Sequence, residues 1–419
     1  MTMRIVLLST SDSFGGAAIA ATRLMIALRK EGACVKMLVR NRELKDPDII
    51  SIYRGPLSKR INQLRFVWER FVIYFQNGLD CRKLFKVSIA NTGVNVSQCS
   101  VIQNADIIHL HWINQGFLSL GDIEKLQKTG KPIVWTMHDM WPITGICHHA
   151  WECEKYSNEC GKCPLLNSRK QFDLSLLVLR KKKVLNSNIT MVAVSSWLKK
   201  KALMSSIAHG KNVKIIPNAI DLGVFHPLER AAARKKFSLP VEKKIILMGA
   251  ARIDDPVKGF SFLKEALNNL YAEDKGILLV LLGEIKNNGI LLGGVSFPII
   301  QLGFRSDLSE IAQLYSAVDV NVVPSFYETF GQTIIEAMAC GCPSVSFDNS
   351  GQVDIIDHKK NGYLAAYKDA ADLATGIDWV LNKADREKLS FNARKKVEEN
   401  YSEAVVAKQY IELYRSLLK

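Results

Sequence analysis

Residues 318–347 of this 419-residue chain read VDVNVVPSFYETFGQTIIEAMACGCPSVSF. The segment begins with an apolar run at Val318–Val323 and passes through a loop into a helical pattern that starts near Phe330. It ends with a second apolar run at Pro343–Phe347. Two buried strands joined by a helix are typical of a parallel sheet. We therefore predict a strand, helix and strand here.

The same alternation of strand-like and helical runs extends over the whole chain and predicts an α/β fold. In the first half, the expected strands are Arg4–Ser9, Cys34–Val39, Asp106–His111, Pro132–Met137, Thr190–Val194 and a closing strand at Lys214–Asn218. In the second half, they are Lys244–Gly249, Ile277–Gly283, Pro298–Leu302, Val318–Val323 and Pro343–Phe347. Rossmann-like parallel sheets of this kind bind ligands at the carboxyl ends of their strands.

The length of the chain favours two domains, because single cores rarely grow beyond about 250–300 residues. Leu222–Val241, with its prolines and many charges, is the expected crossing. We predict an N-terminal Rossmann-like domain at 1–225 and a C-terminal Rossmann-like domain at 226–400. A helix over 401–419 is expected to pack back on the first domain, and the two sheets are expected to face each other across a cleft.

The composition is that of an ordinary globular protein, with 48% hydrophobic and 23% charged residues. The longest apolar runs, such as Ile277–Leu282, are too short to span a bilayer. The N-terminal sequence MTMRIVLLST reads as a first strand and not as a signal peptide, so we expect a cytoplasmic location.

The formal net charge of +15 comes from the first half of the chain. Residues 1–225 hold 32 Lys and Arg against 16 Asp and Glu, whereas the remainder holds 24 against 25. A basic half favours an anionic partner, such as lipid head groups, a phosphorylated acceptor or nucleic acid. A merely solvated surface is the alternative.

Glu328 and Glu336, in the segment quoted first, are separated by seven residues. Glu328 falls in the loop ahead of the helix, and Glu336 falls within the helix. A helix start offers free N–H groups and a positive dipole end to phosphate or sugar oxygens. Gly331 allows a ligand to approach the backbone closely. A surface helix with two solvated glutamates is the alternative interpretation.

This stretch resembles the Glu-x7-Glu signature of family 4 of the glycosyltransferases. Further motifs stand in the order of that family: Gly15–Gly16, His138–Asp139, Pro217–Asn218, and Arg252 with Lys258. The resemblance covers nearly the whole chain. It implies the two-domain GT-B fold, with an acceptor-binding domain at 1–225 and a nucleotide-sugar-binding domain at 226–400. It also implies retention of the anomeric configuration of the donor sugar and catalysis without a metal.

The resemblance also implies roles for the cations and the glutamates. Arg252 and Lys258 would hold the donor diphosphate, and two cations suit the charge that develops on such a leaving group. Glu336 would accept hydrogen bonds from the ribose hydroxyls, and Glu328 would lie beside the transferred sugar. An ordinary loop ion pair with a neighbouring aspartate is the alternative for the cations.

The backbone N–H groups of Phe330 and Gly331 would, by the same resemblance, meet the sugar or phosphate. Two departures from the family pattern leave the donor sugar open. Gln332 stands where many relatives carry Leu, and Asn349-Ser350-Gly351 replaces a commoner Gly-Gly pair.

In the first half, the loop Ser13–Gly16 precedes a helix that starts at Ala17. This loop lacks the full G-x-G-x-x-G dinucleotide fingerprint. It resembles the glycine loop that lines the acceptor side near the donor phosphates, so Gly15 and Gly16 are candidate ligand contacts. His138 ends a strand and matches a position that contacts the donor sugar in similar enzymes. His109 and His111 are expected to pack or to line the acceptor site.

Four of the nine cysteines cluster within 17 residues: Cys147, Cys153, Cys160 and Cys163. Four thiols that end in a C-x2-C pair suit a structural, tetrahedral zinc site in a reducing compartment. Reduced packing thiols or disulfides are the alternatives, and disulfides are disfavoured in cytoplasm.

Residues Lys59–Lys86 alternate aromatic groups with bases. Apolar residues fall at helical spacing at Ile61, Leu64, Trp68, Phe71, Val72 and Phe75. Such a segment is typical of an interfacial helix on anionic lipid, with Arg65, Arg70, Arg82 and Lys83 as the bases that meet the head groups. A helix that covers the core is the alternative.

Taken together, the sequence predicts a retaining, metal-independent glycosyltransferase of the hexosyltransferase class. It would transfer sugar from a UDP- or GDP-sugar to a lipid-linked glycan, at the inner face of the cytoplasmic membrane, in bacterial surface polysaccharide synthesis such as that of O-antigen, lipopolysaccharide or capsule. No covalent sugar intermediate on a carboxylate is expected, because in this family the leaving phosphate is thought to help deprotonate the acceptor. A nucleotide-sugar epimerase of the same fold and a nucleic-acid-binding protein are the rivals.

Overall fold

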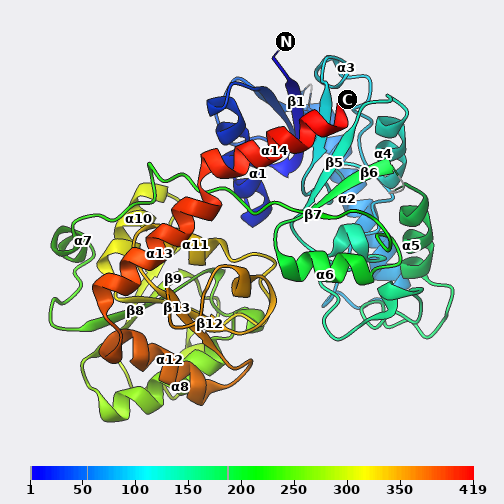
Figure 1. The fold of residues 1–419 in the computed structure, drawn as a ribbon. Coiled ribbons are helices and arrows are strands. Elements are labelled where there is room, and N and C mark those ends of the chain that lie inside the picture. The colour runs from blue at the N-terminus through cyan, green and yellow to red at the C-terminus, as the bar shows by residue number, and fades with distance from the viewer. Residues whose placement is uncertain (1, 54, 186–187) are drawn as a thin grey trace. The chain divides into compact units, whose positions relative to one another are not determined.

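The computed structural model describes residues 2–53, 55–185 and 188–419, which divide into two compact units (Figure 1). Unit 1 comprises Met1–Ala219 together with Val406–Lys419, and unit 2 comprises Ile220–Val405. Each unit is an α/β domain built on its own parallel sheet.

The described residues of unit 1 form a seven-stranded sheet in the order β3-β2-β1-β4-β5-β6-β7, and every neighbouring pair is parallel. The strands are β1 (Arg4–Ser11), β2 (Cys34–Asn41), β3 (Ile49–Ser51), β4 (Ile107–Leu110), β5 (Ile133–Met137), β6 (Ile189–Ala193) and β7 (Lys214–Ile215). The helices are α1 (Gly16–Lys30), α2 (Pro56–Gln76), α3 (Ser100–Gln103), α4 (Leu120–Gln127), α5 (Leu174–Leu185), α6 (Ser196–Met204) and, at the C-terminus, α14 (Glu403–Leu417).

The described residues of unit 2 form a six-stranded parallel sheet in the order β10-β9-β8-β11-β12-β13. Its strands are β8 (Lys244–Arg252), β9 (Ile277–Glu284), β10 (Ile299–Gly303), β11 (Val320–Val323), β12 (Ser344–Phe347) and β13 (Gly362–Ala365). Its helices are α7 (Arg230–Lys236), α8 (Phe260–Glu273), α9 (Asn288–Leu292), α10 (Leu308–Ala317), α11 (Gln332–Ala339), α12 (Ala370–Asp378) and α13 (Arg386–Tyr401).

The predicted α/β architecture with two parallel sheets is confirmed, and each predicted strand overlaps one that the structure describes. Within the described ranges, β3 and β13 are strands that the sequence pattern did not predict. Both are short, and β13 begins with glycine, which is depleted in strands. Both lie at a sheet edge, where they pair with a single neighbour.

The boundary between the units lies at Ala219 and Ile220, ahead of the predicted position at 225. The Ile220 N–H donates to the Tyr401 carbonyl at 2.9 Å, and Ile220 pairs with Ser402 in a parallel bridge. These contacts attach the chain to the end of α13 in unit 2. The return to unit 1 accordingly comes at Val406, within α14, and not at 401.

Helix α14 packs on unit 1 through its buried face (Figure 1). Val406, Tyr410 and Tyr414 join the core formed by α1 and the strands β1 and β2. The Tyr414 hydroxyl pairs with His109 Nδ1 at 2.7 Å, and the Tyr410 hydroxyl pairs with Thr136 Oγ1 at 2.7 Å. The C-terminal helix therefore supports the two strands, β4 and β5, that lead into the pocket described below.

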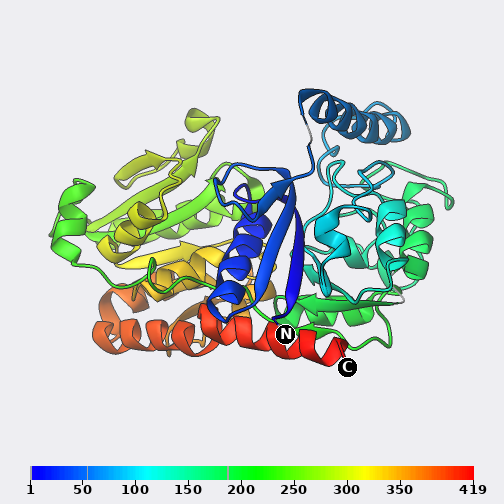
Figure 2. The ribbon, with the colours of Figure 1, turned by 90° about the horizontal axis from the view of Figure 1, so that it is seen from above.

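Helix α2 lies on the outside of unit 1 and has an unusual distribution of side chains (Figure 2). Its buried residues are Asn62, Glu69, Arg70 and Ile73, three of them polar. The prediction that Arg70 faces lipid is therefore wrong: its guanidinium donates to the carbonyls of Leu84 and Val87. Among the described residues, no helix is long and apolar enough to cross a bilayer.

Candidate active site

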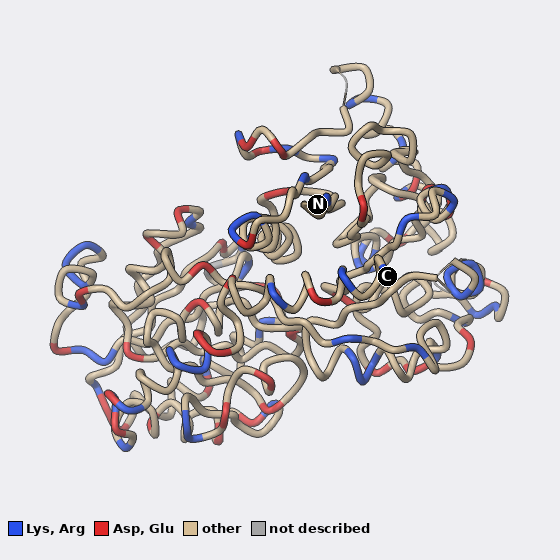
Figure 3. The backbone as a smooth tube through the Cα atoms, turned by 45° about the horizontal axis from the view of Figure 1, so that its top comes forward, with Lys and Arg blue, Asp and Glu red and all other residues tan. Residues whose placement is uncertain are grey.

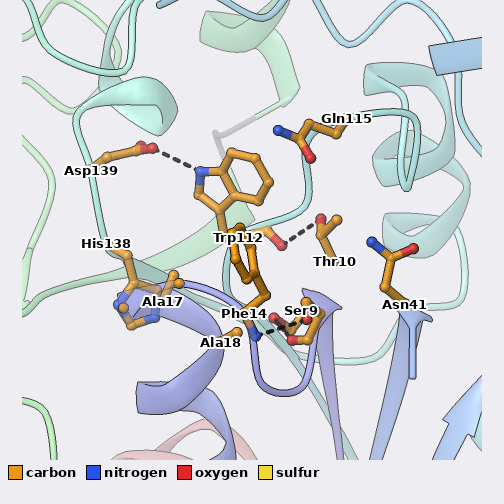
Figure 4. A pocket seen from close by; sticks show the side chains of 13 residues that line it. Ser9, Thr10, Phe14, Ala17, Ala18, Asn41, Trp112, Gln115, His138 and Asp139 are labelled. Carbon is orange, nitrogen blue, oxygen red and sulfur yellow. Dashed lines mark hydrogen bonds between the residues drawn. The ribbon is translucent and has the colours of Figure 1, made fainter. Parts of the chain in front are cut away.

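Unit 1 contains a pocket of about 300 Å³ at the carboxyl ends of its central strands (Figure 4). The strand order reverses between β1 and β4, and ligands of open α/β sheets bind at such a switch point. The lining residues are Ser9, Thr10, Ser11, Phe14, Gly15, Gly16, Ala17, Ala18, Asn41, Trp112, Gln115, His138 and Asp139. The structure thus brings the predicted Gly15, Gly16 and His138 together in one pocket.

Gly15 forms the turn that leads from β1 into α1. Its φ of +90° is a conformation that L side chains rarely adopt, and a Cβ built there would meet no described atom within 4 Å. The loop ahead of it is held by Ser11 Oγ, which accepts from the backbone N–H groups of Ser13 and Phe14. The turn therefore presents open backbone at the N-terminus of α1.

His138 follows β5 and lines the pocket. Its Nε2 lies 2.9 Å from Nδ1 of His111, and the two rings stack with centroids 5.2 Å apart. Burial lowers the pKa of His138 to about 4, so the imidazole is neutral at pH 7. His138 is therefore placed to make hydrogen bonds to a ligand but carries no charge.

Asp139 holds one wall of the pocket in place. Its Oδ2 accepts from Trp112 Nε1 at 2.8 Å and lies 2.6 Å from His148 Nδ1, while its Oδ1 accepts from the Trp141 N–H. Burial raises the pKa of Asp139, but the contacts with His148 and Trp141 outweigh this and lower it to about 2. The carboxylate therefore fixes the Trp112 indole, a pocket residue that the sequence reasoning missed.

In unit 2, Lys258 and Glu328 form an ion pair, with Lys258 Nζ 2.8 Å from Glu328 Oε1. Lys258 lies in the turn after β8, and Glu328 lies in the loop after β11. β8 and β11 are neighbours at the point where the strand order of this sheet reverses. Although burial lowers the pKa of Lys258, Glu328 raises it above its usual value, so Lys258 stays charged.

Two backbone contacts bring these loops together. The Phe326 N–H donates to the Val257 carbonyl at 2.8 Å. Gly259 has a φ of +70°, and a Cβ at this position would lie 1.9 Å from the Pro324 carbonyl oxygen. Only glycine therefore lets the turn after β8 approach the loop after β11 so closely.

A third segment, η5 (Ser350–Asp354), supports the Glu328 loop. Ser350 Oγ accepts from the Glu328 N–H at 3.0 Å, and the Gly351 N–H donates to the Glu328 carbonyl at 2.7 Å. Asn349 Nδ2 donates to the Phe326 carbonyl at 2.7 Å. The sequence reasoning noted these residues as a departure from the family pattern and missed their role as the support of this loop.

Arg252 ends β8 and contacts Asp254, with the Nε to Oδ1 and Nη2 to Oδ2 distances both 3.2 Å. This is the loop ion pair that the sequence left open as the alternative for the cation. The Arg252 side chain remains half exposed, at 50%. It is therefore accessible to a ligand that competes with Asp254.

The remaining predicted residues of unit 2 lie around the start of α11. Gly331 is its N-cap with φ +118°, and Phe330 is buried with its ring edge-on to Tyr401. The Phe330 ring therefore packs, and its backbone is the part that is left for a ligand. Glu336 lies within α11, and its Oε2 is 3.5 Å from the Tyr315 hydroxyl.

The four clustered cysteines line one small cavity of about 20 Å³ in unit 1. Among the described residues, however, no group of three or more His, Cys, Asp and Glu is placed to hold a metal ion, and all nine cysteines are free thiols. His148, which lies among them in sequence, contacts Asp139 and Ser88 instead. The geometry gives the zinc prediction no support, and zinc binding stays a prediction.

The fold and the two sites at the carboxyl ends of the sheets define a protein of the GT-B class. Residues 229–396 match the family model described as "Glycosyl transferases group 1". Unit 2 is therefore similar to the domain that this family model describes. The matched segment contains Arg252, Lys258, Glu328 and Glu336.

The chain is also similar to several whole proteins. An uncharacterised glycosyltransferase of Methanocaldococcus jannaschii is 28% identical over 77% of this chain and 85% of its own length. A D-inositol 3-phosphate glycosyltransferase of Thermobispora bispora is 24% identical over 67% of this chain and 63% of its own length. The crystal structure of Anabaena HepE in complex with UDP-glucose is 17% identical, with a TM-score of 0.66 over 99% of this chain and 100% of that one.

Proposed function

We propose that this protein is a retaining, metal-independent glycosyltransferase that transfers a hexose from a nucleoside diphosphate sugar to a glycan acceptor. The observation that carries the proposal is the Lys258–Glu328 ion pair at the reversal point of the sheet in unit 2. It lies inside the region that matches group 1 glycosyltransferases. The HepE complex, with a similar fold, contains UDP-glucose, which favours a UDP-sugar over a GDP-sugar as the donor.

Arg252 and Lys258 are the groups that we assign to the donor diphosphate. Each is paired with a carboxylate within hydrogen-bond distance, Arg252 with Asp254 and Lys258 with Glu328. A diphosphate carries more negative charge than one carboxylate, and it can therefore compete for both cations. The cations stabilise the charge that grows on the leaving phosphate as the glycosidic bond to the nucleotide breaks.

The glutamates take the sugar side of the donor in this proposal. Glu328 loses its partner when Lys258 turns to the phosphate, which leaves its carboxylate free to accept from sugar hydroxyls. Glu336 accepts from the ribose hydroxyls, and the backbone N–H groups of Phe330 and Gly331 meet the sugar or phosphate. The leaving phosphate takes the proton of the acceptor hydroxyl, which requires no carboxylate nucleophile.

We assign the acceptor to unit 1 and propose that it is lipid-linked. The supporting feature is the apolar stripe of α2, defined as Leu57, Ile61, Leu64, Trp68, Phe71 and Phe75. The exposed fraction of these six side chains runs from 43% to 71%. The helix buries polar residues and exposes apolar ones, the reverse of a helix that covers a core.

Exposed bases lie on α2 and in the segment that follows it, namely Lys59, Arg60, Arg82 and Lys86. They belong to the half of the chain that holds the excess of Lys and Arg, which Figure 3 colours blue along the backbone. An exposed apolar helix face with bases nearby in the sequence suits the surface of an anionic bilayer. On this basis we propose that the protein acts as a peripheral membrane protein on the cytoplasmic side. The pathway that we propose, synthesis of a bacterial surface polysaccharide, rests on the family resemblance.

The proposed reaction is tested by incubating the protein with UDP- and GDP-sugars and a lipid-linked oligosaccharide. We expect one donor to be consumed together with the acceptor, and the new linkage to keep the anomeric configuration of the donor in the NMR spectrum. A chelator should leave the rate unchanged. Inversion at the anomeric carbon contradicts retention, and donor isomerised without acceptor supports the epimerase, which the comparisons do not favour.

Membrane docking is tested by sedimentation with vesicles that contain anionic lipid, at low and high salt. Replacing Leu64, Trp68 and Phe71 with Gln should abolish binding, and Arg60→Glu with Arg82→Glu should weaken it by roughly 1 kcal/mol per base or more. The matched control is Lys181→Glu with Lys200→Glu, which makes the same charge change on exposed residues of α5 and α6. Equal loss in both charge variants means that net charge alone causes the binding, and no binding by the wild type contradicts docking.

A further inference from the structure

The imidazole of His111 is buried and contacts the pocket residue His138. It follows β4, is 3% exposed, and its Nδ1 lies 2.9 Å from Nε2 of His138. Trp135 Nε1 donates to the His111 carbonyl at 3.0 Å, which fixes the backbone on which the ring stands. His109 packs against the other side, with ring centroids 4.3 Å apart.

The second nitrogen of His111, Nε2, is buried and has no hydrogen-bond partner among the residues that the structure describes. Both nitrogens of His109, by contrast, have partners, the Tyr414 hydroxyl and Thr136 Oγ1. Within the described chain, the His111 ring therefore makes a hydrogen bond to His138 and to no other residue.

Two neutral imidazoles in contact through one nitrogen each share a single proton, and two arrangements are available. Burial lowers the pKa of both rings, which supports the neutral state. In the first arrangement His111 carries its proton on Nδ1 and donates to His138. In the second, His138 donates to His111, and His111 must then carry its own proton on Nε2.

The unpartnered Nε2 decides between these arrangements. The second arrangement buries an N–H donor that has nothing to donate to, a situation that is rare in folded proteins. The first arrangement leaves only an unused lone pair at that place. When His111 donates to His138 Nε2, His138 must carry its own proton on Nδ1.

We propose that His111 is a positioning residue that locks His138 into the tautomer protonated on Nδ1, so that His138 meets its ligand as a hydrogen-bond donor. The ligand is then an oxygen acceptor, a phosphate or a sugar hydroxyl of the nucleoside diphosphate sugar, and His138 does not act as the base for the acceptor hydroxyl. The assignment of the ligand rests on the proposed function, whereas the tautomer does not.

The test is the ¹⁵N NMR spectrum of histidine-labelled protein at pH 7.5 without ligand, in which protonated and bare ring nitrogens have distinct shifts. His138, assigned through His138→Gln, should carry its proton on Nδ1. His111→Asn keeps an amide N–H in the place of Nδ1 and should preserve this tautomer. His111→Asp places an acceptor where the donor was, and His138 should then carry a proton on Nε2.

Protonation of His138 on Nε2 in the wild type overturns the proposal, as does a His111→Asp spectrum in which Nε2 stays bare. If His111→Asp does not fold, the wild type and His111→Asn decide the tautomer. Activity supplies a second readout: His111→Asp should lower the transfer rate about tenfold or more, and His111→Asn should stay within about threefold. Equal rates in all three proteins overturn the positioning role. Absence of transfer in the wild type contradicts the proposed function and leaves the tautomer result intact.

With the tautomer in place, addition of UDP and of UDP-sugar separates the two oxygen sources. A shift of the His138 Nδ1 resonance with UDP alone indicates phosphate as the acceptor of its hydrogen bond. A shift with UDP-sugar only indicates a sugar hydroxyl. If the resonance shifts with neither compound, His138 makes no hydrogen bond to an oxygen of the nucleotide sugar, and the ligand assignment is overturned.

Discussion

At the scale of single residues, Gly259 is the point where the two loops of the candidate donor site in unit 2 meet. A methyl group here would lie 1.9 Å from the Pro324 oxygen, so the loops must separate or the substitution must be rejected. We expect Gly259→Ala to destabilise unit 2 by about 2 kcal/mol or more and to weaken donor binding. Chemical denaturation and nucleotide titration measure the two effects.

Gly303→Ala is the matched control for this substitution. Gly303 has nearly the same φ, +66°, but a Cβ there would meet no described atom within 4 Å. It should cost only the backbone strain of about 1 kcal/mol and leave donor binding unchanged. Equal effects of the two variants would mean that the close approach of the loops is unimportant.

The buried histidines of unit 1 should make the stability of the protein depend on pH. Burial lowers the pKa of His109 to about 3 and of His138 to about 4, and also lowers that of His111. The unfolded chain binds these protons below about pH 6.5, and the folded protein does not. Stability is therefore fully present above pH 6.5 and falls as the pH drops toward 4, by roughly 1.4 kcal/mol per pH unit for each histidine.

Denaturation curves at several pH values between 6.5 and 5 give this slope. His109→Gln should lower the slope of unfolding free energy against pH by the contribution of one histidine. His209→Gln, at an exposed position, should leave the slope unchanged. A wild-type stability that is flat over this range would contradict the burial of neutral imidazoles.

At the scale of elements, α2 shows what the sequence pattern predicts and where it misleads. The helical spacing of apolar residues correctly indicated a helix, but the pattern contains no information on which face meets the protein. The part of unit 1 that α2 packs against contains backbone groups that need hydrogen-bond partners, and polar side chains of α2 are those partners. Glu69 accepts from the N–H groups of Ile89 and Ala90 at 2.8 and 2.9 Å.

On α2, we therefore expect substitution of a buried polar residue to cost more stability than substitution of an exposed apolar one. Glu69→Ala should destabilise the protein by about 1–3 kcal/mol, because two buried N–H groups lose their acceptor. Leu64→Ser, at a position 69% exposed, should change stability by less than about 0.5 kcal/mol. Thermal unfolding of the two variants decides, and a larger effect for Leu64→Ser would contradict the outward apolar stripe.

The cysteine cavity is a feature on which the sequence and the structure give different information. Spacing predicted zinc ligands but does not specify where the sulfur atoms point. The structure brings the four thiols to one cavity, and within its described ranges it shows no group of three or more His, Cys, Asp and Glu placed to hold a metal ion. If zinc is bound nevertheless, metal analysis of the purified protein should find about one ion per chain, and a chelator should lower the melting temperature more than the turnover. Metal-free protein with unchanged melting would leave the thiols as packing groups.

At the scale of the whole molecule, the alternation of strands and helices sufficed to predict both parallel sheets, because buried parallel strands are apolar along their whole length. The partners within the sites were less accessible. Lys258 and Glu328 are 70 residues apart, and their contact depends on the Gly259 turn and on η5. No sequence spacing indicates the roles of Trp112 and His111, because these depend on contacts with Asp139 and His138, which follow a different strand.

Unit 2 should bind a nucleoside diphosphate sugar through Lys258, and calorimetric titration with UDP and with GDP measures this binding. We predict that one of the two nucleotides binds with one site per chain. Lys258→Ala should raise its dissociation constant about tenfold or more, because a partly buried, charge-assisted contact with phosphate is lost. Lys275 is exposed and precedes β9, at the amino ends of the strands and away from the carboxyl ends where Lys258 lies, so Lys275→Ala should stay within about twofold. Binding of neither nucleotide, or equal affinities in both lysine variants, would rule out Lys258 as the group that binds the diphosphate.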